Sequence, residues 1–484
     1  MFPLVILASC ASLSVQGQQW NQFRGPGGRG VASSDDGLPT EFGPEKNMIW
    51  QCKLDAGHSS PCIWGDHMFL TTFVGKKLET VCVNRATGVV TWRRSVTVDA
   101  LERHHRINNP ASSTPTTDGE RVYVYFGSFG LLCYDFAGKE LWHREFEQVR
   151  NMFGTAASPI VAGELLVLSR DIQKNSFLEA IHGATGETAW RTDRSGFQSG
   201  WSTPTVWKNG EVDELLVYGA FQLTAYELKS GKERWSVPGL ADEPCITPVT
   251  GEGLVFVSSY NMRTNPEVIG LPKFAQLLKD YDKDGNGALN REEAKPNKSV
   301  LSRADADGEG DHPLSMFFRF LDADRNGEID SKEWGKLGKW LGTFKHANAL
   351  LAIQPGNGSD TEPKVAWQHG KGVPECPSPL YHGGRVYLVK NAGIATCLNA
   401  KTGEAIYQQR IGSRGPCYSS PVVGDGKIYT ASARGVVTVF AVGDELKVLA
   451  HNDLKERITA TPAIVDGKIY VRTEKRLFAF GLAN

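Results

Sequence analysis

The stretch 113-STPTTDGERVYVYFG-127, followed closely by 132-LCYDFAGKELW-142, decides the fold. A hydroxyl residue and a proline lead into a short strand, a Gly-containing turn and an alternating strand. A second turn with glycine then joins two further strands, and the last of them ends in tryptophan. The pattern predicts a unit of four short antiparallel strands joined by tight hairpins.

The same unit recurs along the chain, and a proline marks each copy. Successive prolines lie 41 to 54 residues apart, except for one interval of 131 residues. That period, with four strands in each copy, is typical of β-propeller blades. Eight copies therefore predict eight blades. The marker residues are Pro61, Pro115, Pro159, Pro204, Pro248, Pro379, Pro421 and Pro462.

The third strand of each copy carries a small or β-branched residue at one aligned position, which predicts a buried site there. The last copy ends at 477-LFAFGLAN-484 without a fourth strand, whereas 49-IWQCKL-54 belongs to no copy. Because Trp50 matches the fourth-strand tryptophans, we expect an all-β, eight-bladed β-propeller closed by this N-terminal strand. The aligned third-strand residues are Cys82, Cys133, Ala180, Ala225, Ala352, Cys397, Val439 and Ala479.

The long interval between Pro248 and Pro379 contains two loops that match the twelve-residue EF-hand pattern, 282-DKDGNGALNREE-293 and 322-DADRNGEIDSKE-333. Carboxylates and amides at alternate positions, a central glycine and a final glutamate form the ligand order of calcium loops. Helical spacing of apolar residues around them predicts a small α-helical EF-hand pair inserted into blade five. The predicted calcium ligands are Asp282, Asp284, Asn286, Ala288 through its carbonyl, Asn290, Glu293, Asp322, Asp324, Asn326, Glu328, Asp330 and Glu333.

The chain start, 1-MFPLVILASCASLSVQG-17, is an apolar run followed by small residues, which is typical of an export signal and too short for a spanning helix. Residues 7-LASC-10 resemble a lipoprotein box, so either Cys10 carries a lipid that attaches the chain to a membrane, or the signal is cleaved near Gly17. We expect a periplasmic or extracellular protein. The net charge of −1 gives no reason to expect nucleic-acid binding.

These patterns divide the chain into five segments. We expect a signal peptide at 1–17, an N-terminal arm at 18–48, propeller at 49–263, the EF-hand insert at 264–346 and the remaining propeller at 347–484.

The segment 179-EAIHGATGETAW-190 matches the turn pattern A-x-D-x-x-T-G-x-x-x-W except that His182 stands in place of the aspartate, and it resembles the tryptophan-docking repeat of PQQ-type, quinoprotein-like β-propellers. The opening 20-WNQFRGP-26 resembles the start of an exported subgroup of them. The resemblance implies the propeller fold. It covers both PQQ-dependent alcohol dehydrogenases and an outer-membrane assembly lipoprotein without catalytic activity. The dehydrogenases hold PQQ with calcium, a carboxylate base and often two adjacent cysteines, and this sequence has no adjacent cysteines.

Loops that lead from one blade into the next inner strand should converge on one mouth of the central channel. A small ligand or an envelope protein could bind there, or the residues could only hydrate the channel rim. Cys245, Cys376 and Cys417 lie at the same entrances, either as free thiols or with a disulfide among them. The expected mouth residues are His58, Arg106, Asn108, Asn109, Trp201, Glu243, Glu375, Arg414, Tyr418 and Arg457.

No H-E-x-x-H, G-x-S-x-G or P-loop pattern occurs in the sequence. Our first hypothesis is therefore an exported, calcium-binding propeller that acts as a binding or assembly scaffold in the cell envelope. The alternative is a PQQ-dependent oxidoreductase of an alcohol or sugar, with Glu243 or Glu375 as its carboxylate. A hydrolase or lyase acting on polysaccharide is a third interpretation, which no motif selects.

Overall fold

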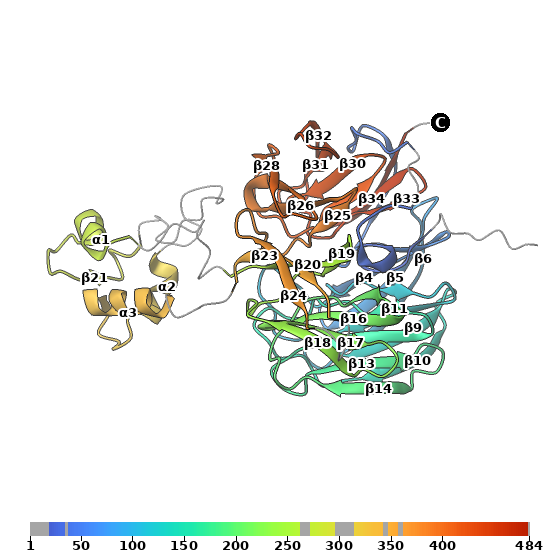
Figure 1. Cartoon of the computed structure of the whole chain (residues 1–484), viewed down its shortest axis with the longest axis horizontal. Helices are drawn as coiled ribbons and strands as arrows, with labels where there is room; N and C mark the ends of the chain where they lie inside the picture. Colours follow the sequence, from blue (N-terminus) through green and yellow to red (C-terminus); the bar gives the residue numbers. More distant parts are fainter. Residues whose placement is uncertain are drawn as a thin grey trace, which may run out of the picture.

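The computed structural model describes residues 19–33, 37–261, 272–295, 314–341, 347–356 and 362–482. The predicted signal peptide and Cys10 lie outside the described residues. Eight antiparallel sheets surround a central axis, which confirms the predicted eight-bladed β-propeller (Figure 1). In the described residues no helix is both long enough and apolar enough to cross a membrane.

The first four blades follow the chain in order, each from its inner to its outer strand. Blade 1 contains β3 (Cys62–Trp64), β4 (His67–Val74), β5 (Lys77–Asn84) and β6 (Val90–Thr97). Blade 2 contains β7 (Thr116–Thr117), β8 (Arg121–Phe126), β9 (Gly130–Asp135) and β10 (Glu140–Glu145). Blade 3 contains β11 (Ile160–Ala162), β12 (Leu165–Arg170), β13 (Phe177–His182) and β14 (Thr188–Asp193). Blade 4 contains β15 (Thr205–Asn209), β16 (Val212–Gly219), β17 (Gln222–Glu227) and β18 (Glu233–Pro238).

The remaining blades include the interrupted one and the one that closes the ring. Blade 5 contains β19 (Val249–Gly251), β20 (Leu254–Ser259), β23 (Ala349–Gln354) and β24 (Lys364–His369). Blade 6 contains β25 (Leu380–His382), β26 (Arg385–Lys390), β27 (Ile394–Asn399) and β28 (Ala405–Arg410). Blade 7 contains β29 (Val422–Gly424), β30 (Lys427–Ala431), β31 (Val436–Ala441) and β32 (Val448–Asp453). Blade 8 contains β33 (Ala463–Val465), β34 (Lys468–Arg472), β35 (Arg476–Gly481) and β2 (Met48–Lys53).

The ring closes as the sequence predicts. β2 pairs with β35, and Trp50 lies opposite Ala479. The indole N–H of Trp50 also donates to the carbonyl of Arg85 in blade 1, at 2.9 Å. The last blade is therefore completed by the N-terminal strand, which covers the edge of β35, and it is joined to the first blade.

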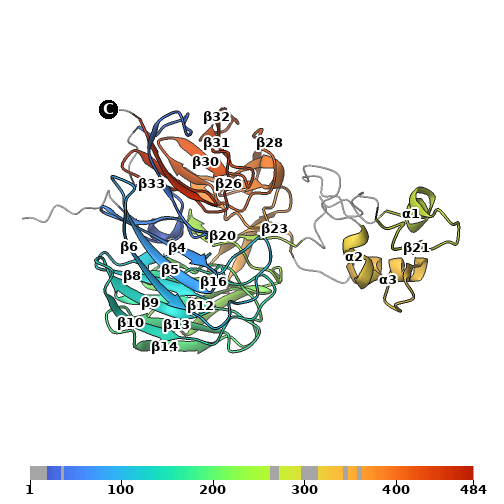
Figure 2. The same cartoon turned by 180° about the vertical axis from the view of Figure 1, so that it is seen from behind.

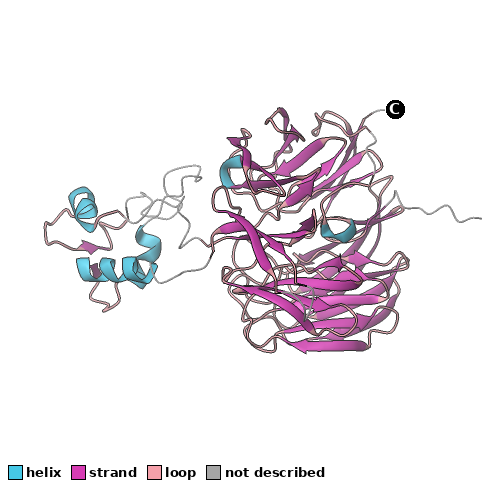
Figure 3. Cartoon of the chain, viewed as in Figure 1, coloured by secondary structure: helices cyan, strands magenta, loops and turns pink. Residues whose placement is uncertain are grey.

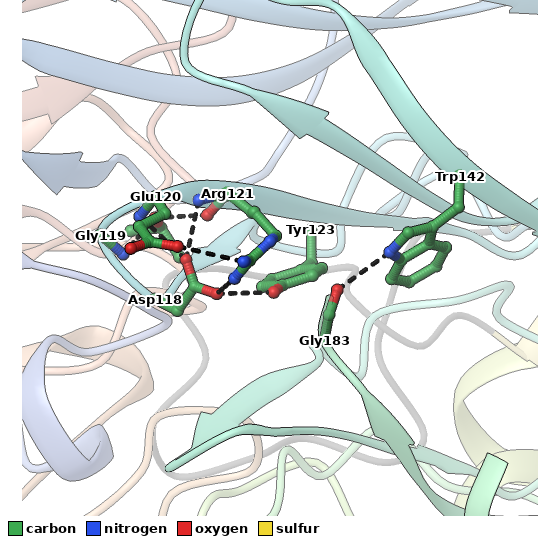
Figure 4. Close-up of polar contacts among 8 residues, drawn as sticks. Asp118, Gly119, Glu120, Arg121, Tyr123, Trp142 and Gly183 are labelled. Carbon is green, nitrogen blue, oxygen red and sulfur yellow. Dashed lines mark hydrogen bonds and ion pairs between the residues drawn. The ribbon is translucent and has the colours of Figure 1, made fainter. Parts of the chain in front are cut away.

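The repeated tryptophan joins neighbouring blades. Trp142 on β10 lies opposite Cys133 and donates its indole N–H to the carbonyl of Gly183 in blade 3, at 2.9 Å (Figure 4). Gly186 of the same blade 3 turn has φ +76°, and a Cβ there would lie 2.8 Å from the indole ring. The glycine of this turn therefore provides both the left-handed backbone and the space for the neighbouring ring. All eight aligned third-strand residues are fully buried.

The hairpin between β7 and β8 also contacts Trp142, through Tyr123. The Asp118 carboxylate accepts hydrogen bonds from the Tyr123 hydroxyl and the Arg121 guanidinium, both at 2.7 Å (Figure 4). The ring of Tyr123 packs 5.9 Å from that of Trp142. Tyr123 and Trp142 thus link the inner hairpin of blade 2 to the outer strand of the same blade, and Trp142 links that strand to blade 3.

A ring of hydrogen bonds joins the inner ends of the blades. The residue before each marker proline carries a hydroxyl, and it accepts the backbone N–H of the equivalent residue in the preceding blade. Seven of these eight contacts are present, and the contact from blade 4 to blade 5 is missing among the described residues. The bonds run from Ser60 to Thr114, Thr114 to Ser158, Ser158 to Thr203, Thr247 to Ser378, Ser378 to Ser420, Ser420 to Thr461 and Thr461 to Ser60, all at 2.9–3.1 Å.

The N-terminal arm crosses one end of the channel, which the sequence did not predict. β1 (Gln19–Trp20) pairs with β3 as a fifth strand of blade 1, and Trp20 is fully buried. A short helix, η1 (Pro26–Gly28), lies near the ring centre (Figure 1). The Arg24 guanidinium donates to the Pro379 carbonyl of blade 6 at 2.6 Å. The arm therefore contacts blades on both sides of the axis.

A helical insert interrupts blade 5 between β20 and β23. It contains α1 (Phe274–Tyr281), β21 (Leu289–Asn290), α2 (Leu314–Leu321), β22 (Glu328–Ile329) and α3 (Ser331–Leu341). Figures 2 and 3 show these helices beside the strand-rich ring. Leu289 pairs with Ile329, and both are fully buried with Leu277, Phe318 and Trp334 in a core of the insert's own.

Candidate functional site

A cavity of about 190 Å³ lies on the propeller axis. Loops of all eight blades contribute to its wall, and six of the eight hydroxyl residues of the hydrogen-bonded ring form part of it. Phe23, from the N-terminal arm, also lines it. The cavity is therefore built between the loop mouth of the channel and the arm that crosses its other end.

Six of the residues that the sequence places at the channel mouth line this cavity. They are His58, Asn108, Trp201, Glu243, Glu375 and Tyr418. Four others lie outside its wall: Arg106 and Arg414 are exposed, Asn109 is buried, and the Arg457 guanidinium lies 5.8 Å from the centre of the Tyr418 ring. The loop geometry was therefore predictable, but the direction of each side chain was not.

Sequence reasoning missed several aromatic residues of the wall, namely Phe23, Phe153 and Tyr260. The ring of Phe153 packs edge-on against Trp201, with centroids 5.3 Å apart. Trp201 donates its indole N–H to the Gly154 carbonyl at 2.6 Å. Tyr260 directly follows β20, Phe23 lies in the N-terminal arm and Phe153 lies in the loop before blade 3, and none of the three recurs at equivalent positions of the other blades.

Buried polar contacts hold the two loops that precede blades 2 and 3. The Glu102 carboxylate accepts the Thr155 hydroxyl at 2.8 Å and its backbone N–H at 3.1 Å. Asn108 donates from its amide to the carbonyls of Phe153 and Thr155, at 2.9 and 3.0 Å. Burial raises the pKa of Glu102 to about 7, so the charge that joins these loops changes near neutral pH.

The cavity wall contains two carboxylates, Glu243 and Glu375, and none of its described residues is a lysine or arginine. Burial, helped by the nearby Arg472 and Arg457 cations, lowers the pKa of His58 to about 3. His58 is therefore a neutral imidazole at pH 7. The wall combines aromatic rings, hydroxyls and acidic groups.

The two predicted calcium loops each gather three carboxylates. Oxygen atoms of Asp282, Asp284 and Glu293 lie within 4.8 Å of one another. Asp322, Asp324 and Glu333 form the equivalent group in the second loop.

The other predicted ligands mostly shape the loops. Asn290 and Asp330 each accept two backbone N–H groups of the following turn through their side-chain oxygen. The Asn286 amide donates to the Glu328 carboxylate at 3.0 Å, which joins the two loops. Ala288 is buried, and its N–H donates to the Asn286 side chain.

Comparison with known proteins identifies the family. The sequence profile described as outer membrane protein assembly factor BamB matches residues 34–171, 76–269 and 348–484. The chain belongs to this family. A search of curated protein sequences finds no match.

Solved structures share the propeller fold at low sequence identity. BamB from Moraxella catarrhalis is 11% identical, with a TM-score of 0.54 over 90% of this chain and 98% of that one. A europium-containing methanol dehydrogenase is 12% identical, with a TM-score of 0.55 over 96% and 98%. The quinohemoprotein alcohol dehydrogenase of Comamonas testosteroni is 11% identical, with a TM-score of 0.53 over 96% and 81%. At such identity these likenesses concern the fold alone.

Proposed function

We propose that this BamB-family propeller is an exported, calcium-binding scaffold that binds an envelope protein at its axial cavity. The observation that carries the proposal is the chemistry of the cavity wall. Five aromatic residues surround two carboxylates, and none of the described wall residues is cationic. Such a wall favours a neutral or cationic group, because carboxylates and the faces of aromatic rings both attract positive charge.

A lysine or arginine side chain on a loop of the partner is the group that fits best. Its aliphatic stem would pack on aromatic rings, and its charged end would reach Glu243 or Glu375. The family description, an assembly factor of the outer membrane, supports a protein partner rather than a metabolite.

PQQ fits this wall poorly. The quinone carries three carboxylates, and binding them requires cationic donors that the described wall residues do not offer. Glu243 and Glu375 would instead repel them. The chain also lacks the adjacent cysteines of the dehydrogenase pattern. We therefore derive no reaction through PQQ.

Calcium binding in the insert is supported by the state of its carboxylates. Glu293, Asp322 and Glu333 are only 2%, 6% and 5% exposed. Oδ1 of Asp322 is buried and accepts no hydrogen bond within the described part of the chain. Buried carboxylates that face one another need a cation, and six or more oxygen ligands in a flexible loop suit calcium.

The calcium part is tested by isothermal titration of the chelator-treated protein. We expect two bound ions in the wild type and a loss of tight binding at one site in Glu333→Gln. The matched control is Glu292→Gln, an exposed neighbour outside both clusters, which should keep both ions. Absence of calcium binding, or an insert whose protease resistance is the same with and without chelator, would overturn this part.

The scaffold part is tested by affinity capture from envelope extract with wild-type protein and with the Glu243→Gln/Glu375→Gln variant. We expect a partner that the wild type retains and the double variant loses, with Glu164→Gln as an exposed control. The same proteins are assayed for dye reduction after addition of PQQ and calcium. Dye-linked turnover on an alcohol or sugar that the double variant abolishes would replace the scaffold by a quinoprotein oxidoreductase.

A further inference from the structure

Two cysteines occupy the same place in neighbouring blades. Cys245 lies three residues before Pro248 of blade 5, and Cys376 lies three residues before Pro379 of blade 6. Both side chains line the axial cavity and are partly exposed. The equivalent region of blade 7 holds Cys417, which is buried and lies outside the cavity wall.

Cys245 and Cys376 lie on the two sides of the boundary between blades 5 and 6, and two residues further along each segment the Thr247 N–H donates to the Ser378 hydroxyl at 3.0 Å. A side-chain hydrogen bond with Cys376 is the largest cause that raises the pKa of the Cys245 thiol. Burial contributes next, followed by the charges of Cys376, Glu243 and Glu375. The thiols thus meet in the wall of the cavity, beside its two carboxylates, although 131 residues separate them in the chain.

We propose that Cys245 and Cys376 are a thiol–disulfide pair that covalently joins blades 5 and 6 inside the cavity wall. The inference goes beyond the scaffold function. Neighbouring thiols that line a cavity and are partly exposed are accessible to a disulfide donor, in contrast with the fully buried Cys82, Cys133 and Cys397 of the blade interiors. An exported location would expose them to an oxidising environment.

The reaction is thiol–disulfide exchange with a low-molecular-weight disulfide such as glutathione disulfide. One cysteine thiolate attacks a sulfur of the donor, which breaks the donor S–S bond and releases one glutathione thiol. The second cysteine thiolate then displaces the remaining glutathione from the mixed disulfide. The protein loses two protons and two electrons, and the donor leaves as two reduced thiols.

The surroundings of the pair set its reactivity. Because Glu243 and Glu375 help to raise the pKa of Cys245, little thiolate is present at pH 7 and exchange is slow. The rate should rise about tenfold for each pH unit below that pKa. Removing a nearby negative charge should also accelerate it.

The proposed disulfide would hold blade 5, the blade that the insert interrupts. Blade 5 is completed only after residues 272–341 have been traversed, and the hydroxyl ring lacks its contact between blades 4 and 5 among the described residues. A disulfide from blade 5 to blade 6 would tie this part of the ring covalently to its neighbour.

The experiment uses the full-length reduced protein, incubated in glutathione redox buffers at pH 7 and pH 8 and quenched with an alkylating reagent. Intact mass and peptide mapping then report which thiols remain. We expect the oxidised protein to carry two fewer alkyl groups than the alkylated reduced control, and a linked peptide containing Cys245 and Cys376. The linked peptide should form about tenfold faster at pH 8, and faster in Glu243→Gln than in wild type at pH 7.

Single variants make the assignment specific. Cys417→Ser should still form the linked peptide, whereas Cys245→Ser and Cys376→Ser should not and should instead retain glutathione on the remaining cysteine. Circular dichroism establishes that each variant keeps the wild-type fold. The proposal is overturned if both thiols stay fully alkylated after exposure to oxidised glutathione. It is equally overturned if wild-type protein accumulates only a mixed disulfide, or if either cysteine pairs with Cys417.

Discussion

Replacing Glu102 by glutamine should remove a pH dependence from the stability of the fold. The Glu102 carboxyl is 1% exposed and accepts two hydrogen bonds from Thr155 in the next loop. Burial is the largest cause of its raised pKa, with the Thr155 hydrogen bonds acting in the opposite direction. Glutamine has nearly the same shape and keeps an oxygen acceptor, but it never carries a charge.

The expected magnitude follows from the pKa in the two states. Below pH 4.5 the carboxyl of Glu102 is protonated both folded and unfolded, so it adds no pH dependence. Between pH 4.5 and 7 the folded protein retains the proton that the unfolded chain has lost, and stability therefore falls as the pH rises. The difference between a pKa of 4.5 and one of about 7 corresponds to about 3 kcal/mol of unfolding free energy, which is fully lost above pH 7.

The assay is thermal and urea unfolding of both proteins from pH 4.5 to pH 8.5 at constant ionic strength. We expect nearly equal stability at pH 4.5 and an advantage for Glu102→Gln that grows to about 3 kcal/mol by pH 8. The exposed Glu164→Gln variant should track the wild type throughout. A stability difference between Glu102→Gln and wild type that is the same at every pH would refute the reasoning.

Three further predictions concern the blade contacts and the insert. Trp142→Phe keeps an aromatic ring but leaves the Gly183 carbonyl without its donor, so urea unfolding should show a loss of about 1 kcal/mol. Gly186 has φ +76°, and Gly186→Ala would place a methyl group 2.8 Å from the Trp142 ring, so the free energy of unfolding should fall by about 2 kcal/mol or more. Gly163→Ala, at φ +62° with no atom within 4 Å, should cost only the backbone strain of about 1 kcal/mol, and equal losses in the two glycine variants would contradict the proposed contact. Glu333→Gln should weaken calcium binding in the insert by at least about tenfold in titration calorimetry, and an unchanged affinity would place the ion elsewhere.

The repeat explains why so much of the fold was predictable. Most copies place a hydroxyl, a proline, turn glycines and a tryptophan at set intervals, and the same contacts recur in most blades: the indoles of Trp50, Trp92, Trp142, Trp190 and Trp367 each donate to a backbone carbonyl of the next blade. Trp50, far from the last blade in sequence, could be assigned to it because its register matches that of Trp142. The contacts of the N-terminal arm could not be predicted in this way, because Trp20 and Arg24 lie outside the repeated units and have no equivalent residues in other blades.

The two candidate sites also differ in how far the sequence predicts them. The predicted calcium loops are local, since a dozen consecutive residues supply the carboxylates of Asp282, Asp284 and Glu293, and the sequence pattern was enough to group these side chains. The axial cavity is not local. Whether His58 or Arg106 enters it depends on the direction in which each loop turns, and the meeting of Cys245 with Cys376 depends on the angle between two blades. Sequence therefore determined the blades, their closure and the acidic clusters of the insert, because these follow from short-range patterns, whereas only the closed ring decided which side chains share the space at its centre.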